Sequence, residues 1–358
     1  MALRTLFLCA IFVAISFEVE AKRKPNILII LADDVGTGDI PAYWNSSNVE
    51  MPNIDRLASK GITFKDAHSS SACAPSRYML LSGNYAHRGV SPRGLYRFEA
   101  SGNQFLNGQK SIAEVLRDEA GYATAMFGKW HLGAGVPRDA GAKRNLTHHL
   151  TGSGVNWTRR LIQGPQDIGF DSSVITTGGI QSSPYSFFRN GYLSTNISDV
   201  KYWEDGEYKM QHGTSKILYS GEGSPDWDSS AYNMIVVNET IQFIDDHLEQ
   251  ENDDPFFAYV ALGAVHSPHS PPDFYLDGSR VANTTETRHL DMLKELDMIV
   301  GSLVSAVESR NLTEETIIIF TSDNGGLPAS NRITTHKASG KLRGFKGSIY
   351  EGKYFLTK

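Results

Sequence analysis

Continuous apolar runs alternate with segments of helical spacing along most of the chain. Residues 26–32 form an apolar run of the kind found in strands that are buried on both faces. Comparable runs predict further strands over residues 122–127, 256–262 and 316–321. Apolar side chains at helical spacing predict helices over residues 54–60, 232–248 and 284–307. This alternation predicts an α/β fold, in which helices cover both faces of a mostly parallel central sheet.

Helix-capping signals predict one further helix, whereas one long stretch of the chain shows no periodic pattern. Ser111 and Glu114 form a capping-box pattern that opens a helix, and Gly121 is suited to end it. The stretch from Pro137 to Asp228 is rich in Gly, Ser, Thr, Asn and Tyr and has no clear period. We interpret it as long excursions outside the sheet.

Composition narrows the class of protein. The chain has 358 residues, of which 40% are hydrophobic and 21% charged, which is ordinary for a globular protein and excludes wholesale disorder. The length fits one large α/β unit or two domains at most. The net charge of −6 gives no reason to expect a nucleic-acid partner.

The N-terminal residues predict entry into the secretory pathway. Arg4 precedes an apolar run from Leu6 to Phe17, and Val19-Glu20-Ala21 supplies a small-residue cleavage site. Residues 1–21 are therefore predicted to be a signal peptide, and no other stretch approaches the ~20 apolar residues of a membrane span. Seven N-x-[ST] sequons fit a glycoprotein delivered to lysosomes or secreted. The sequons begin at Asn45, Asn145, Asn156, Asn196, Asn238, Asn283 and Asn311.

The cysteine count changes once the signal peptide is removed. Cleavage after Ala21 removes Cys9 and leaves Cys73 as the one cysteine. A secreted protein usually uses its cysteines in disulfides, so a single thiol needs a chemical explanation.

The surroundings of Cys73 allow three interpretations. Pro75 and Gly83 are suited to the first turn and the end of a helix, so Cys73 is expected at a helix N-terminus. A thiol there would have a lowered pKa and be reactive. A small buried hydrophobe is the structural alternative. A cysteine nucleophile paired with His131 or His266 is another.

Two of the predicted strands end in oxygen-bearing side chains. Asp33 and Asp34 follow the run at 26–32, and Asp323 and Asn324 follow the run at 316–321. Such a set of oxygen ligands suits Ca²⁺ or Mg²⁺ rather than zinc. Helix caps or Asx turns are the alternative for either pair alone, and two pairs in the same setting favour the metal.

The other two strand ends carry basic side chains and imidazoles. The strand at 122–127 leads to Lys129 and His131, and the strand at 256–262 leads to His266 and His269. In an open α/β sheet, ligands bind beyond the carboxyl ends of the strands. If the four strands are parallel neighbours, we expect all of these side chains to converge at one edge.

The residues from Cys73 to Arg77, Cys-Ala-Pro-Ser-Arg, match the C-x-P-S-R core that sulfatases use to convert a cysteine into formylglycine. Leu81-Ser82-Gly83 resembles the second half of that motif, with Ser where Thr is commoner. The other family blocks follow in order: Pro25 to Asp34, Gly128 to His131, His266 to His269, Thr321 to Gly325, Arg343 to Gly347 and Tyr350 to Gly352. The chain thus resembles a type I sulfatase of the arylsulfatase kind, within the alkaline-phosphatase-like fold.

The resemblance implies a sulfuric ester hydrolase with a modified nucleophile. A formylglycine-generating enzyme would oxidise Cys73 to an aldehyde, which hydrates to a gem-diol. One hydroxyl would attack the sulfur of a sulfate monoester, and the second would release sulfate from the enzyme. The substrate would be a sulfated small molecule or glycan.

The resemblance also implies a role for each site residue. The four oxygen ligands, Asp33, Asp34, Asp323 and Asn324, would hold Ca²⁺. Arg77 would orient the formylglycine, and Lys129 and Lys346 would pair with the sulfate oxygens. Asp323 could take a proton from the gem-diol. His131 would assist collapse of the intermediate, and His266 would protonate the leaving alcohol.

The end of the chain departs from the family pattern. After Gly352, Lys353 stands where the family has another glycine, and the smaller C-terminal antiparallel domain is expected to be missing. The predicted organisation is a signal peptide at 1–21, an incomplete catalytic domain at 22–352 and a divergent tail at 353–358. Two alternatives stay open: a phosphonate or phosphodiester hydrolase of the same superfamily, or an inactive secreted glycoprotein. The sequence leaves the oligomeric state open.

Overall fold

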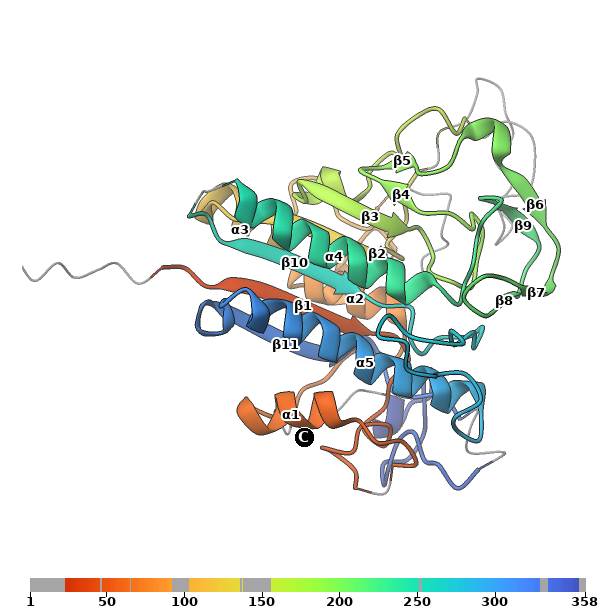
Figure 1. Ribbon diagram of the computed structural model, residues 1–358. Helices are drawn as coiled ribbons and strands as arrows, with labels where there is room; N and C mark the ends of the chain where they lie inside the picture. Colours follow the sequence, from red (N-terminus) through yellow and green to blue (C-terminus); the bar gives the residue numbers. More distant parts are fainter. Residues whose placement is uncertain are drawn as a thin grey trace, which may run out of the picture.

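The computed structural model describes residues 23–45, 47–64, 66–91, 103–135, 137, 156–250, 253–328 and 334–353. Its centre is a seven-stranded sheet (Figure 1). The strands lie side by side in the order β11 (Thr316–Ser322), β1 (Asn26–Ala32), β10 (Phe256–Ala261), β2 (Ala123–Lys129), β3 (Ser172–Thr176), β4 (Phe188–Arg189) and β5 (Tyr192–Leu193). The first five are parallel, and β4 and β5 pair antiparallel at one side. The predicted mostly parallel sheet is confirmed.

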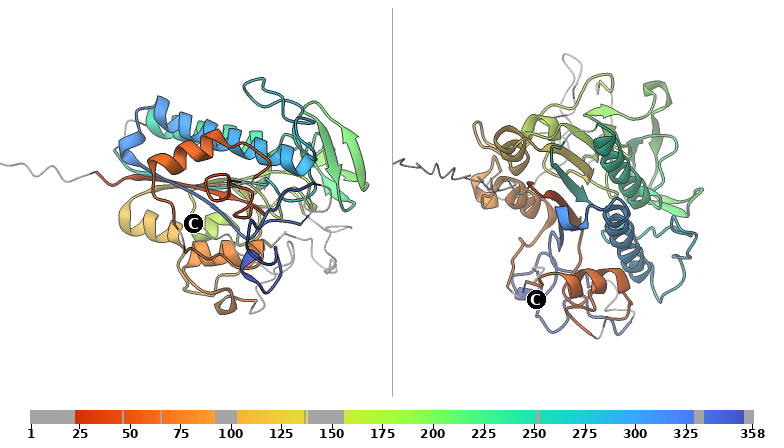
Figure 2. Two further views of the ribbon diagram at one scale, coloured as in Figure 1. Left: turned by 90° about the horizontal axis from the view of Figure 1, so that it is seen from below. Right: turned by 60° about the vertical axis from the view of Figure 1, so that its left-hand side comes forward.

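Helices cover both faces of this sheet, as predicted. On one face lie α1 (Pro52–Lys60), α4 (Tyr232–Glu249) and α5 (Arg288–Ser309), and on the other α2 (Cys73–Ser82) and α3 (Ile112–Ala120), as Figure 2 shows from below. Alternate residues of β1 divide between the two layers: Leu28 and Ile30 pack on the α4 and α5 side, and Ile29 and Leu31 on the α2 side. This two-sided burial is why the strand reads as a continuous apolar run.

The helix ends follow the local signals. The Ser111 hydroxyl accepts a hydrogen bond from the Glu114 amide at 3.0 Å and caps α3, and Gly121 ends the helix in the left-handed conformation at φ 72°. Helix α5 begins at Arg288, later than the spacing predicted, because Thr287 caps it by accepting from the Leu290 amide.

The prediction for residues 137–228 was wrong in part. Strand β3 and the β4–β5 hairpin belong to the central sheet. With the sequence Ser-Ser-Val-Ile-Thr, β3 is short and half polar, so its apolar pattern is weak. Other described segments of this stretch form two small sheets beyond the carboxyl ends of the parallel strands (Figure 1). They pair β6 (Lys201–Trp203) with β9 (Gly221–Gly223), and β7 (Gly206–Lys209) with β8 (Thr214–Ile217).

Several predictions concern residues outside the described part of the chain. The signal peptide at 1–21, the sequon at Asn145 and most of the tail at 353–358 lie there. Of the six described sequons, five present an exposed asparagine, and Asn156 is half-buried. Within the described ranges, none of the helices combines the length and apolar character needed to cross a bilayer.

Candidate active site

The carboxyl ends of four neighbouring strands bring the predicted polar residues to one edge of the sheet. Asp33 and Asp34 directly follow β1, and Asp323 and Asn324 follow β11. The backbone continues the sheet here: the Asp323 amide donates to the Ala32 carbonyl at 3.1 Å. The Asp34 amide donates to Asp323 Oδ1 at 3.2 Å, with Asp34 at φ 65°. Pairing of β1 with β11 therefore joins the two oxygen-bearing pairs.

Strands β2 and β10 supply the basic groups. Lys129 is the last residue of β2, is fully buried, and places its Nζ 2.5 Å from Asp33 Oδ2. His131 follows at φ 53°, with its amide bonded to the Thr177 carbonyl at 2.9 Å. His266 follows β10 and lies with Nε2 3.6 Å from Asp34 Oδ2. The four strand ends converge as expected.

Helix α2 presents Cys73 and Arg77 from the same face, one turn apart. The buried Arg77 guanidinium donates to Asp323 Oδ2 through Nε at 3.1 Å and through a terminal nitrogen at 2.7 Å. Its other terminal nitrogen donates to the Lys129 carbonyl at 2.9 Å. Arg77 thus fixes the helix that carries the cysteine to the ends of β2 and β11.

Lys346 reaches the same point from residues 334–353. Its Nζ lies 2.5 Å from Asp34 Oδ1 and 3.2 Å from Cys73 Sγ. The backbone of this segment is fixed next to the site: the Lys346 amide donates to the Gly326 carbonyl at 3.1 Å, and the Gly347 amide to the Ser71 carbonyl at 2.9 Å.

Three buried oxygens at this edge have no hydrogen-bond partner among the described residues: Asp33 Oδ1, Asp34 Oδ2 and Asn324 Oδ1. Asn324 Nδ2 donates to Asp34 Oδ1 at 2.8 Å, which leaves its own oxygen unpaired. Unpartnered buried oxygens are costly unless something satisfies them, and a hard cation does so. The residues present therefore fit Ca²⁺.

Possible ligand atoms also cluster at this edge of the sheet. Among the described residues, one group of three or more His, Cys, Asp or Glu side chains has ligand atoms within 4.8 Å of one another, namely Asp33, Asp34, Cys73 and His266.

Charge partners set the ionisation of the buried carboxyls. Burial raises the pKa of Asp33, but Lys129, His266 and Arg77 outweigh it and hold that pKa well below the usual range. Burial together with the negative charge of Asp33 raises the pKa of Asp323, against the effect of Arg77. Asp33 is therefore an anion at neutral pH.

Comparison with family models identifies the family of this chain. The model described as Sulfatase matches residues 25–354. This chain belongs to the sulfatase family. It is 31% identical over 373 residues to the N-acetylgalactosamine-6-O-sulfatase of Bacteroides thetaiotaomicron, covering 93% of this chain and 66% of that protein. It is 31% identical over 355 residues to human arylsulfatase A, covering 96% of this chain and 60% of that protein.

A solved structure agrees with the family assignment. The structure is that of BT33336S-sulf, described in connection with the metabolism of multiple glycosaminoglycans by Bacteroides thetaiotaomicron. It superimposes on this chain with a TM-score of 0.74 at 28% sequence identity. The superposition covers 93% of this chain and 70% of that one. This sulfatase-family chain spans about two thirds or less of the curated relatives just named.

The prediction of a lowered thiol pKa was wrong for the unmodified cysteine. Cys73 is the first residue of α2, as predicted, but it is buried. Burial raises the pKa of its thiol, and Asp323 and Asp33 raise it further, against the opposing effect of Lys129 and Lys346. The helix N-terminus does not compensate for removal of the sulfur from water.

Both histidines of the site are shifted toward the neutral form. Burial lowers the pKa of His266 to about 4, although Asp34 acts in the opposite direction. Its Nδ1 lies 2.6 Å from the Ser267 carbonyl, so a neutral ring carries its proton there and turns a lone pair at Nε2 toward the site. Burial also holds the pKa of His131 well below its usual range.

Two groups that contact or position the residues of the site, one on β10 and one on α4, were not identified from the sequence. Tyr259, in the middle of β10, lies close enough to Arg77 for the guanidinium to lower its pKa against the larger effect of burial. Asn233 of α4 accepts from the Gly263 and Ala264 amides at 3.0 and 3.2 Å and so fixes the segment that leads to His266. A tyrosine in an otherwise apolar strand was the one available signal.

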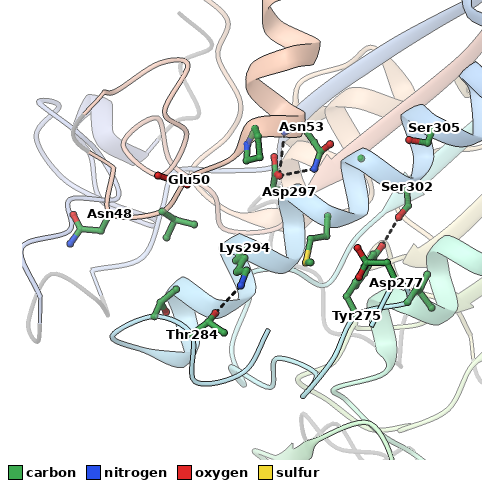
Figure 3. Close-up of a pocket in the computed structure, with 16 residues that line it drawn as sticks. Asn48, Glu50, Asn53, Tyr275, Asp277, Thr284, Lys294, Asp297, Ser302 and Ser305 are labelled. Atoms are coloured by element: carbon green, nitrogen blue, oxygen red, sulfur yellow. Dashed lines mark hydrogen bonds between the residues drawn. The ribbon is translucent and has the colours of Figure 1, made fainter. Parts of the chain in front are cut away.

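A second depression, of about 780 Å³, lies away from the strand ends, between the segment before α1 and one side of α5 (Figure 3). Its polar groups are largely paired with one another. Asp297 accepts from Asn53 Nδ2 at 2.8 Å, and Lys294 donates to Thr284 Oγ1 at 3.2 Å. We place the chemistry at the strand ends, where buried oxygens lack partners.

Proposed function

We propose that this chain hydrolyses sulfate monoesters at residue 73. The observation that carries the proposal is the position of the Cys73 sulfur, 3.2 Å from Lys346 Nζ, in the same group as the unpaired oxygens of Asp33 and Asp34. After conversion of Cys73 to formylglycine, the hydrated aldehyde supplies one hydroxyl to attack sulfur and one to release sulfate. Ca²⁺, when bound by Asp33, Asp34, Asp323 and Asn324, supplies charge neutralisation for the sulfate oxygens.

The remaining residues divide the work of binding and proton transfer. Lys346 and Lys129 pair with the sulfate oxygens as these gain charge. Arg77, fixed by Asp323, orients residue 73. His266 turns its Nε2 toward the site, where it would take up a proton when substrate binds and pass it to the leaving alcohol, and His131 would assist release of the sulfate.

We further propose a sulfated sugar as the substrate class. The relatives include an N-acetylgalactosamine-6-O-sulfatase. The loop after β3 carries three buried polar atoms that have no partner in the part of the chain that the structure describes: Thr177 Oγ1, Gln181 Oε1 and Ser182 Oγ. Gln181 Oε1 and Lys129 Cδ each lie 2.8 Å from the point that a Cβ on Gly179 would occupy, so the amide lies beside the Lys129 stem. Amide and hydroxyl groups left unpaired beside the site suit a leaving group rich in hydroxyls.

Mass spectrometry and turnover test the proposal together. The chain is produced with a formylglycine-generating enzyme, and the peptide containing residue 73 is expected to carry the aldehyde. Turnover is measured with 4-nitrophenyl sulfate, N-acetylgalactosamine 6-sulfate and bis(4-nitrophenyl) phosphate. Preference for the sulfates supports the proposal. An unmodified thiol throughout, or a clear preference for the phosphodiester, overturns it.

Delivery through the secretory pathway, to lysosomes or to the outside of the cell, belongs to the same proposal. It rests on the signal-peptide pattern and on the exposure of Asn45, Asn196, Asn238, Asn283 and Asn311. A mass decrease on treatment with an N-glycosidase is the expected outcome for protein collected from the medium or from lysosomes.

A further inference from the structure

Asp39 and His336 form a fully buried pair behind the active site. His336 Nε2 lies 2.6 Å from Asp39 Oδ1, and neither side chain is exposed. The Asn48 amide donates to His336 Nδ1 at 3.4 Å, so this ring carries its proton at Nε2 and donates it to Asp39. Asp39 Oδ2 accepts from the Gly36 amide at 2.7 Å. The pair thus joins the segment after Asp34 to the segment that leads to Lys346.

The two backbone segments that this pair joins are packed against each other without free space. The Gly38 amide donates to the Ala338 carbonyl at 2.8 Å. A Cβ on Gly36 would lie 2.1 Å from the Ala338 oxygen, and one on Gly38 would lie 1.8 Å from the Lys337 oxygen. These distances leave room only for glycine, so the two segments lie against each other through their main chains.

Two more histidines extend the pair to a third segment. The His336 ring packs on His289 of α5 at 6.3 Å between centroids, and His289 packs on His269 at 5.0 Å. His269 follows His266 by three residues. The row therefore connects the segments that carry Asp34, Lys346 and His266. Unlike the group at the strand ends, the ligand atoms of this row do not all come within 4.8 Å of one another, so among the described residues the row is not a metal group.

We propose that Asp39 and His336 are positioning residues that hold Lys346 against Asp34 and residue 73. Lys346 arrives on a segment without regular structure, and a long lysine side chain needs a fixed backbone to keep its Nζ in place. The kinetic part of this proposal rests on the proposed sulfatase activity, whereas the structural part does not.

The kinetic test is a double-mutant cycle in the full chain, with 4-nitrophenyl sulfate as substrate. His336→Ala is expected to lower kcat/KM by about 10²-fold, because it displaces a charged group at the reacting centre. In a Lys346→Ala background the same change is expected to cost less than about 3-fold, because the group it positions is gone. His336→Gln, which keeps a donor near the Nε2 position, is expected to stay within about 5-fold of the unmodified chain.

A matched control separates positioning from general stability. His247 is also buried, bonds through Nε2 to the Asp254 carbonyl at 2.8 Å, and lies near the end of α4. His247→Ala is expected to lower the melting temperature and leave kcat/KM within about 2-fold. Equal losses from His336→Ala in both Lys346 backgrounds, or an equal loss in the His247 variant, overturn the proposal.

Hydrogen–deuterium exchange tests the structural part without any activity. Amides of residues 337–347 are expected to exchange faster in His336→Ala than in the unmodified chain, with His336→Gln restoring protection and His247→Ala leaving it unchanged. Unchanged exchange in His336→Ala overturns the proposal even if turnover falls. Faster exchange in a chain that turns over no sulfate ester overturns the proposed function and leaves the positioning pair standing.

Discussion

Two groups of buried acids in this molecule have opposite surroundings. On α5 and next to it, the acids accept from backbone amides: Asp291 from Asn283, Thr284 and Thr285, and Asp297 from Asn53 and Ile54. At the strand ends, Asp33 and Asp34 each keep one oxygen without a partner and face Lys129 and Lys346 with the other. Burial is the same in both groups.

The difference separates buried carboxylates that stabilise the fold from those that are arranged to bind a ligand. An acid whose lone pairs are filled by amides fixes the chain, because each amide would otherwise lose its partner. An acid that keeps a lone pair unfilled among cationic side chains is arranged for a ligand that arrives later. Four predictions test this comparison.

The largest effect is expected at the strand ends. Asp34→Asn keeps the shape of the side chain but removes the charge that faces Lys346, and it weakens the metal site. We expect kcat/KM for 4-nitrophenyl sulfate to fall by about 10³-fold, with a change below about 1 kcal/mol in the stability of the chelator-treated chain. The matched control is Asp297→Asn, which should lose stability and keep its turnover. Comparable turnover losses in the two variants would contradict the comparison.

The reverse result is expected on α5. Asp291→Ala deprives three backbone amides of their acceptor, so the free energy of unfolding should fall by about 3 kcal/mol. Measured well below the melting temperature, kcat/KM should stay within about 2-fold of the unmodified chain. Denaturant titration and steady-state kinetics check the two halves. A large kinetic loss with intact stability would place Asp291 in the other group.

Glu295 sharpens the comparison, because within the described ranges it has one unpaired oxygen and no cationic side chain that shifts its pKa. Oε1 accepts from Asn233 Nδ2 at 3.1 Å, Oε2 has no partner, and burial raises its pKa from 4.5 to about 8. The folded state therefore favours the protonated acid. The resulting stability is fully present below about pH 4.5 and is lost as the pH rises through about 8.

Glu295→Gln should remove that pH dependence. The variant should be more stable than the unmodified chain by up to about 3 kcal/mol near pH 7, and the difference should vanish near pH 4. Thermal unfolding of both proteins across this range measures it. A constant difference at every pH would show that Glu295 does not titrate in the folded state as described.

The smallest effect is expected from Ca²⁺ itself. Filling the unpaired oxygens should stabilise the folded chain by on the order of 2 kcal/mol when Ca²⁺ is at about 30 times its Kd. The melting temperature should rise with Ca²⁺ after chelator treatment, and this rise should persist in Asp297→Asn and disappear in Asp34→Asn. An equal rise in both variants would place the ion elsewhere.

Much of the fold could be predicted because its signals are local or periodic. Strands β1 and β11 were placed within one residue, since each forms a continuous apolar or β-branched run. Strand β3 was missed because five residues with two serines carry too little pattern. For the site, motif order and strand ends identified the residues that the sheet brings together, but not the groups behind them.

The sequence by itself determined the layered α/β fold, the order of the strand-end side chains and the position of Cys73 at the start of a helix. The tertiary structure alone decided which carboxylates keep an oxygen unpaired, that burial raises rather than lowers the pKa of the thiol, and that Asp39 meets His336 across 297 positions of the chain. The physical reason is the distance along the chain over which each effect acts. Hydrophobic period, caps and turns act over a few residues, whereas desolvation and hydrogen-bond partnership depend on every segment that packs around a group.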